Sequence, residues 1–92
     1  MQYLVIEHFR NRDPVPIYQR LRERGRLMPE GLSYVASWIL DDLSRCYQIM
    51  ETTNRALLEE WMAGWADLME FEVFTVRSSA EVQARLAPQV GA

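Results

Sequence analysis

Lysine is absent from this 92-residue chain, so all ten basic side chains are arginine, and 13 acidic residues give a formal net charge of −3. Proteins that bind nucleic acid depend on basic side chains that neutralise phosphates. An acidic total without a lysine-rich segment therefore weakens the case for such a partner. The composition predicts no nucleic-acid partner.

Cysteine and histidine each occur once, as Cys46 and His8. A single cysteine excludes an internal disulfide and disfavours a zinc site built from cysteines, and it suits a reducing compartment. No run approaches the ~20 apolar residues that span a bilayer. The first residues, QYLVIEHF, are too short and lack the basic start of a signal peptide. We therefore expect a cytoplasmic protein with no membrane partner.

What the chain does have is apolar material: 49% of its residues are hydrophobic, including three Trp, four Tyr and three Phe. This fraction is too high for a disordered segment. The length allows one domain, with a thin core that buries about two-thirds of the unfolded surface. We expect a single domain over residues 1–92, with its core at about 2–78 and a short tail helix at about 79–87.

Four runs rich in β-branched and aromatic residues predict strands, at residues 2–9, 32–40, 43–51 and 71–77. Asp41 and Asp42 separate the second and third runs. Two short polar residues between such runs favour a hairpin, although glycine, which makes this signal strong, is missing.

Two longer helices are predicted between the strands. Asp13 followed by Pro14 is typical of a helix start, and Gly25 of a helix end. The second helix follows a capping residue within 52–54, and Gly64 falls inside it. Its apolar residues recur at the spacing of a core-facing stripe: Leu57, Leu58, Trp61, Met62, Trp65 and Leu68. Ser78 and Glu81 form a capping-box pattern that predicts the tail helix.

The order βαββαβ, with the tail helix added, predicts an α+β ferredoxin-like fold. Its four-stranded antiparallel sheet has the order 4-1-3-2, with two helices on one face. Both alternating sets of residues in the strands are apolar, for example Val5 and Ile6. The face without helices therefore needs cover. We expect a homodimer in which two sheets meet face to face.

Two polar residues near the end of the first strand are candidate catalytic groups. Glu7 is either an acid with a raised pKa in a pocket, or an ion-pair partner, Arg45 being one choice, or a dimer contact. His8 is either an acid/base or a hydrogen-bonded histidine at a strand end. No pair of metal ligands repeats at a helical or C-x-x-C spacing, so we expect no metal site and no cofactor, with His8 as the remote exception.

Ser37, Trp38, Cys46 and Gln48 are candidate ligand-binding residues. We assign Ser37 and Gln48 to the space between two sheets, and Cys46 to a buried position. The helix side receives the opposite set, Val5, Trp38, Tyr47 and Ile49, beside Trp61 and Trp65. The same phase also places Glu7 on the helix side, which means either that the phase is wrong or that a polar pocket exists there.

Four arginines crowd the end of the first helix and the residues after it: Arg20, Arg22, Arg24 and Arg26. Such a group can attract a phosphate or carboxylate ligand. The preferred explanation is favourable positive charge at a helix C-terminus, on a solvated face.

Four segments together resemble the small bacterial proteins grouped as domain of unknown function 3303: YLVIEHF, RLRERGRLMPEGLSYVASW, RCYQIMET and LLEEWMAGWADLMEFEV. The resemblance covers residues 3–80 and implies a ferredoxin-like fold of the dimeric α/β-barrel type. The positions that it singles out are Glu7, His8, Trp38, Cys46, Gln48, Glu51 and Trp61. Dimeric α/β barrels include haem-degrading monooxygenases, small isomerases, metal-binding proteins and ligand sensors, so the fold does not select an activity.

These observations predict a small homodimeric ligand-binding or accessory protein with a pocket bounded by the sheet. One alternative is a small enzyme of the monooxygenase or isomerase kind, with His8 or Glu7 as its acid/base. Another is a purely structural interaction module, in which the polar strand residues satisfy one another across the dimer.

Overall fold

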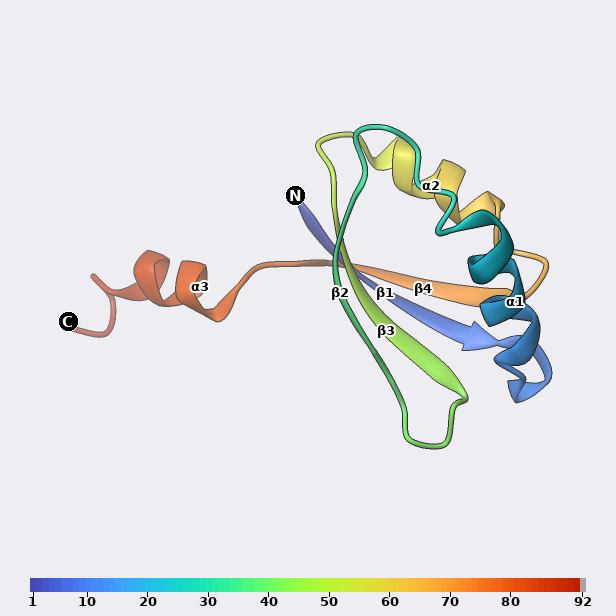
Figure 1. The fold of residues 1–92 in the computed structure, drawn as a ribbon. Coiled ribbons are helices and arrows are strands. Elements are labelled where there is room, and N and C mark those ends of the chain that lie inside the picture. The colour runs from blue at the N-terminus through green and yellow to red at the C-terminus, as the bar shows by residue number, and fades with distance from the viewer. Residues whose placement is uncertain (92) are drawn as a thin grey trace.

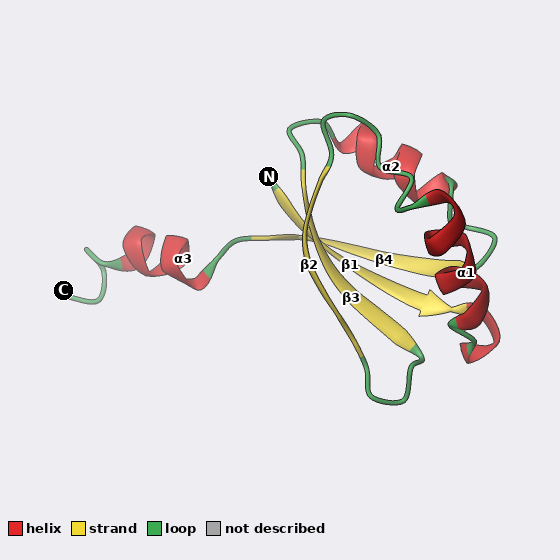
Figure 2. Ribbon diagram, in the orientation of Figure 1, coloured by secondary structure: helices red, strands yellow, loops and turns green. Residues whose placement is uncertain are grey.

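The structure, a computed structural model, describes residues 1–91. Its strands and α-helices follow one another as β1 (Gln2–Phe9), α1 (Val15–Arg24), β2 (Ser33–Ile39), β3 (Arg45–Glu51), α2 (Arg55–Ala63), β4 (Met69–Val76) and α3 (Ser79–Leu86) (Figures 1 and 2). A single 3₁₀ turn, Arg10–Arg12, links β1 to α1. None of the helices within residues 1–91 is long and apolar enough to cross a membrane.

The four strands form one sheet in the order β2-β3-β1-β4, and each neighbouring pair is antiparallel. Helices α1 and α2 lie over one face of this sheet, and the other face is open (Figure 1). The expected α+β ferredoxin-like arrangement and its strand order are therefore confirmed.

The core lies between the sheet and the two helices. Along β1 every second residue is buried, including Tyr3, Val5 and Phe9. The most deeply buried side chains are Val5, Met50, Leu58 and Met69. Burying one such side chain contributes about 1.5–3 kcal/mol, so the thin core depends on a few large residues.

Helix α1 begins and ends through the two signals seen in the sequence. The carboxylate of Asp13 accepts a hydrogen bond from the Val15 N–H at 3.0 Å. At the other end the Gly25 N–H donates to the Leu21 carbonyl at 2.8 Å, with Gly25 at φ 70°. Glycine adopts this left-handed φ without a side-chain clash.

Helix α2 is shorter than the sequence indicates. The Asn54 side chain caps its start by accepting from the Ala56 N–H at 3.0 Å. The helix ends at Ala63, so the expectation that Gly64 lies inside it is wrong. Beyond this point the chain tightens into i→i−3 hydrogen bonds, such as Trp65 N–H to the Met62 carbonyl at 3.0 Å. These turns keep Trp65 on the core side.

The connection between β2 and β3 also differs from expectation. A two-residue turn at Asp41-Asp42 is wrong, because the strands separate at Ile39 and rejoin at Arg45. Two-residue hairpin turns need a positive φ, which favours glycine, and neither Asp41 nor Asp42 is glycine. Instead Asp42 closes a longer loop, accepting from the Ser44 N–H at 3.0 Å and the Ser44 hydroxyl at 2.6 Å.

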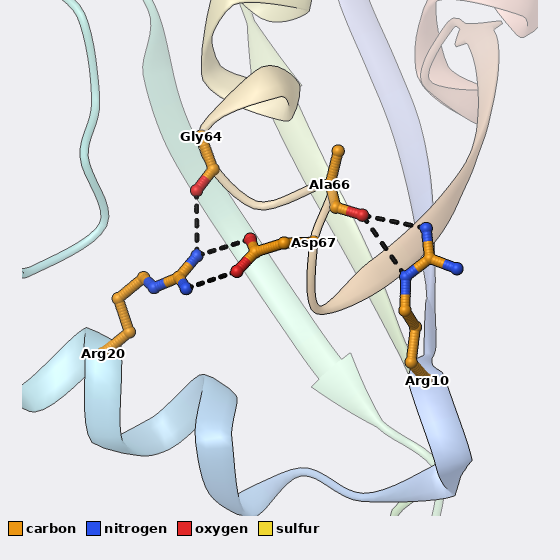
Figure 3. A network of polar contacts seen from close by, with 5 residues as sticks. All are labelled: Arg10, Arg20, Gly64, Ala66 and Asp67. Carbon is orange, nitrogen blue, oxygen red and sulfur yellow. Dashed lines mark hydrogen bonds and ion pairs between the residues drawn. The ribbon is translucent and has the colours of Figure 1, made fainter.

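Two arginines fix the loop between α2 and β4 (Figure 3). From α1, Arg20 donates to both carboxylate oxygens of Asp67, at 2.7 and 2.6 Å, and to the Gly64 carbonyl at 3.1 Å. From the 3₁₀ turn that follows β1, Arg10 donates twice to the Ala66 carbonyl, at 3.3 and 2.9 Å. This loop therefore holds α1, α2 and the sheet in fixed relation.

Helix α3 stands clear of the sheet (Figure 1), and none of its residues is buried. As expected, the Ser78 hydroxyl caps it, accepting from the Glu81 N–H at 3.1 Å. The chain extends over 51 × 31 × 18 Å. Its accessible surface is 6267 Å², against about 5,500 Å² for a compact monomer of this mass. The excess surface reflects the projecting helix.

Candidate functional site

A cavity of about 90 Å³ lies between the sheet and the helices. Its walls are mostly apolar and include Phe9, Ile17, Trp61 and Met69. Six polar side chains interrupt this lining: Glu7, Tyr18, Arg26, Ser37, Cys46 and Gln48. A small apolar cavity with a few polar groups at fixed positions is the usual form of a small-molecule site.

Strand register brings four of these side chains together. Glu7 of β1 is paired with Cys46 of β3, and Gln48 of β3 is paired with Ser37 of β2. Residues 46 and 48 lie two apart on one strand and therefore point to the same face. The structure thus unites Glu7, Ser37, Cys46 and Gln48 on the helix side.

Glu7 is 6% exposed, and burial raises the pKa of its carboxyl group to about 7. A hydrogen bond with Cys46 and the positive charge of Arg26 oppose this effect only in part. Within residues 1–91 Glu7 has no ion-pair partner. An ion pair with Arg45 is excluded, because Arg45 faces the open side and donates to the Tyr47 hydroxyl at 3.4 Å. Glu7 therefore exchanges its proton near neutral pH.

Cys46 is buried, as the sequence indicates. Burial, and then the charge of Glu7 and its hydrogen bond, raise the pKa of the thiol to about 12, while a hydrogen bond with Ser37 has the opposite effect. Since the thiolate is the reactive form, Cys46 is a polar wall of the cavity and not a nucleophile at neutral pH.

Arg26 enters the cavity from the loop after α1. Its carbonyl accepts from the indole N–H groups of both Trp61, at 2.9 Å, and Trp65, at 3.1 Å. Its guanidinium lies 3.7 Å from the ring centroid of Tyr34, whose hydroxyl is 2.7 Å from the Ser37 hydroxyl. Two indoles and one ring thus fix Arg26 at both ends, while the guanidinium has no ion-pair partner in the described part of the chain.

Tyr18 adds a hydroxyl from α1. Burial raises its pKa above the ordinary value, and the nearby Cys46 and Glu7 raise it further. The phenol therefore stays protonated at neutral pH and is able to donate a hydrogen bond into the cavity.

Two predicted site residues lie on the other face of the sheet. His8 is hydrogen-bonded there, its Nε2 lying 2.5 Å from Oε1 of Glu72. Trp38 is 64% exposed and is paired with Tyr47 on the open face. His8 and Trp38 therefore do not share a site with Glu7. No cluster of three His, Cys, Asp or Glu side chains among residues 1–91 is placed to hold a metal ion.

The expected assignment of faces is largely reversed. Ser37 and Gln48 face the helices and not a second sheet, while Trp38, Tyr47 and Ile49 lie on the open face. Of the strand residues assigned to the helix side, only Val5 and Glu7 lie there, while Trp61 and Trp65 are buried on that side as expected. The polar character of a strand residue is a poor guide to its face here, because polar side chains interrupt the mostly apolar lining of the cavity on the helix side. The sequence placed the carboxylate of Glu7 on the helix side, and the cavity explains why a polar residue lies there.

Sequence reasoning assigned no site role to Tyr18, and offered Arg26 two explanations. Tyr18 is 47% exposed and lines the cavity from α1, and an exposed tyrosine on a helix carries no sequence signal of a site. Arg26 directly follows the helix-ending Gly25, where the chain turns back toward the sheet. Of these arginines, Arg26 lines the cavity, whereas Arg20 is paired with Asp67.

Comparison with known proteins identifies the family of this chain. No curated protein and no solved structure matches it. The family model described as "Domain of unknown function (DUF3303)" matches residues 1–90, nearly the whole sequence. The chain therefore belongs to the DUF3303 family.

Proposed function

We propose that this protein binds a small organic molecule in the cavity between the sheet and the helices. The observation that carries the proposal is Glu7, a buried carboxyl group without an ion-pair partner in residues 1–91, which faces that cavity. Burying an acid without a cation is costly. A buried, ionisable group without a charged partner beside a cavity is typical of a binding or catalytic site.

The cavity limits the size of the ligand. A closed apolar cavity of ~150 Å³ holds benzene. By the same proportion, about 90 Å³ encloses roughly three or four carbon atoms. The ligand is a short molecule, or a larger one that inserts its short end.

Proton transfer by Glu7 is a second candidate function. A pKa of about 7 suits a general acid or base at neutral pH. Of the two candidate acid/bases only Glu7 fits this role, because His8 lies on the opposite face and pairs with Glu72. A bound substrate with an exchangeable proton would distinguish catalysis from binding, since Glu7→Gln would abolish turnover but keep the affinity.

The binding of small molecules is tested by titrating the ¹⁵N-labelled protein with acids, amides and alcohols of up to six heavy atoms. We expect amide shifts at Cys46 and at the Trp61 indole, and none at Tyr47, which points to the other face. Cys46→Phe, which fills the cavity, should abolish the shifts, while Tyr47→Phe should leave them. Shifts confined to the open face, or no shifts with any probe, would contradict the proposal and favour a purely structural module.

We also propose that the working unit is a homodimer of the dimeric α/β-barrel type in the cytoplasm. The open face carries a continuous set of apolar side chains: Leu4, Ile6, Trp38, Tyr47, Ile49 and Phe74. Of these, Trp38 and Phe74 are 64% and 48% exposed. Apolar side chains that are exposed together on one face are typical of interaction surfaces. The free thiol of Cys46 suits the reducing conditions of the cytoplasm.

Helix α3 supports the same proposal. A helix of eight residues is marginal in water without tertiary contacts. Its apolar side chains Val82 and Leu86, with Val90 beyond it, are all exposed. A second copy of the chain provides the surface on which this arm can pack.

Size-exclusion chromatography with light scattering tests the dimer. We expect a particle of twice the 10.8 kDa chain mass. Val82→Asp with Leu86→Asp should weaken it, while the control Gln83→Asp on the same helix should not. A stable monomer of the unaltered chain at micromolar concentration would refute the homodimer.

A further inference from the structure

We infer that the cavity takes a short-chain carboxylic acid as its anion, with the carboxylate on the guanidinium of Arg26 and beside the protonated carboxyl of Glu7. This inference rests on the proposed function and names its ligand class. It follows from the hydrogen-bonding character of the polar lining, the apolar walls and the charges that face Glu7.

The polar lining is dominated by donors. Arg26 has a planar set of N–H donors and no acceptor, and none of its side-chain nitrogens has a hydrogen-bond partner within residues 1–91. Stacking on Tyr34 leaves the N–H edge of the guanidinium available. Tyr18 adds a hydroxyl donor, and neutral Glu7 adds another. These donors call for a ligand rich in acceptors, and a carboxylate matches the guanidinium in a bidentate manner.

The remaining walls fit a hydrocarbon chain. Phe9, Ile17, Ile39 and Met69 offer no polar side-chain groups, and the indole N–H groups of Trp61 and Trp65 already donate to the Arg26 carbonyl. A second polar end placed against these apolar walls would be left without a partner. A basic ligand would meet the positive charge of Arg26. The ligand class is therefore a monocarboxylate with a short apolar tail.

Charge controls when such an anion can bind. The groups that face Glu7 are Cys46 from β3, Tyr18 from α1 and Arg26 from the loop before β2. On the fourth strand its partner is Phe71, which carries no charge. Cys46 and Tyr18 are neutral near pH 7, so one positive charge serves the site. A ligand carboxylate and an ionised Glu7 compete for it, and two carboxylates close together repel.

Binding of the anion therefore requires Glu7 in its protonated form. Below pH 7 the affinity should be nearly constant, because Glu7 is protonated and the ligand is ionised. Above pH 7 the affinity should fall about tenfold for each pH unit, since a proton must be taken up with the ligand. Glu7→Gln imitates the protonated form and should remove this dependence.

The test uses calorimetric titration of the full-length protein with sodium butyrate, butyramide and n-butylamine, which share one shape. At pH 6 we expect butyrate to bind at least about tenfold more tightly than butyramide, and n-butylamine not to bind. Arg26→Gln should lose the preference for butyrate, whereas the matched control Arg22→Gln, on the exposed face of α1, should keep it. Arg26→Lys, with the charge but not the planar fork, should retain part of the preference.

Glu7→Gln should bind butyrate at pH 6 as the natural chain does, and equally well at pH 8.5. Equal or weaker affinity for butyrate than for butyramide would overturn the inference but leave the small-molecule proposal standing. A butyrate affinity that stays constant to pH 8.5 in the natural chain would also overturn it. Binding of none of the three probes would overturn it too, and the wider set of fragments then decides separately whether the cavity binds any small molecule.

Discussion

Glu7 and Cys46 stand opposite each other on neighbouring strands, and both side chains line the cavity. Burial raises the pKa of both, to about 7 for Glu7 and about 12 for Cys46, and the charge of Glu7 adds to the effect on the thiol. The pair therefore holds two protons just below neutral pH and releases one just above it. This one exchangeable proton links stability, ligand binding and acid/base chemistry.

Glu7 makes the protein less stable as the pH rises. The pKa is raised from its ordinary value of 4.5 to about 7 in the folded chain. Below pH 4.5 both folded and unfolded forms are protonated, so folding carries no penalty. Between pH 4.5 and 7 the unfolded chain loses its proton first, which lowers the free energy of unfolding by about 3 kcal/mol in total.

Glu7→Gln should therefore match the natural chain in stability at pH 4.5 and exceed it at pH 8 by up to about 3 kcal/mol. Urea unfolding at both pH values, at one protein concentration, measures the difference. If the variant were less stable than the natural chain at pH 8, the carboxyl would not be buried in the manner described.

Cys46 should be almost inert in the folded protein. With its pKa raised from 9.0 to about 12, the thiolate at pH 8 is about a thousandfold rarer than in the unfolded chain. Iodoacetamide labelling followed by mass spectrometry should show this contrast between native and urea-unfolded protein. Glu7→Gln should leave the native reaction slow, because burial is the main cause. Rapid labelling of the native chain would show that the cavity is open to reagents.

Arg20 should matter for stability far more than its neighbours on α1. Arg20→Ala removes the two bonds to Asp67 and one to the Gly64 carbonyl, which together hold the loop before β4 (Figure 3). We expect a melting temperature lowered by several degrees, while Arg22→Ala, an exposed change on the same helix, has little effect. Equal melting temperatures for the two variants in differential scanning calorimetry would show that the contacts of Arg20 with Asp67 and Gly64 do not stabilise the fold.

Phe74 should be essential for the dimer but not for the fold. It is 48% exposed on the open face, opposite Leu4 of β1. Phe74→Glu places a charge in the expected contact between sheets, where burial without a partner is costly. Light scattering should report a monomer with unchanged circular dichroism. Val15→Glu, at a residue of α1 that is similarly exposed, is the control and should remain dimeric; dissociation of both variants would remove the sheet face as the explanation.

The sequence predicts the fold well where the signals are local. Asp13 and Gly25 define α1, Ser78 starts α3, and β1 is evident from its composition. Its element order then allows few topologies. Gly64 was misplaced because the chain tightens after Ala63, where the Gly64 carbonyl accepts from Arg20, a residue 44 positions away in the sequence.

The site was predictable only in part. Glu7 could be identified from the sequence, because burying a carboxylate in an apolar strand is costly unless it has a partner or a function. The face of each strand residue was not predictable, because Val5 and Ile6 are equally apolar and the alternation carries no information about the core. Arg26 reaches the cavity through indole contacts 35 and 39 residues away. Contacts of this range follow from the packed structure and not from any local pattern.

The most direct test is the titration of the Glu7 side-chain carboxyl carbon by ¹³C NMR, with and without saturating butyrate. We expect a midpoint near 7 in the free protein, and a higher midpoint with butyrate, because the anion binds the protonated form. A midpoint near the ordinary value of 4.5 that butyrate does not move would contradict both the buried carboxyl and its part in binding.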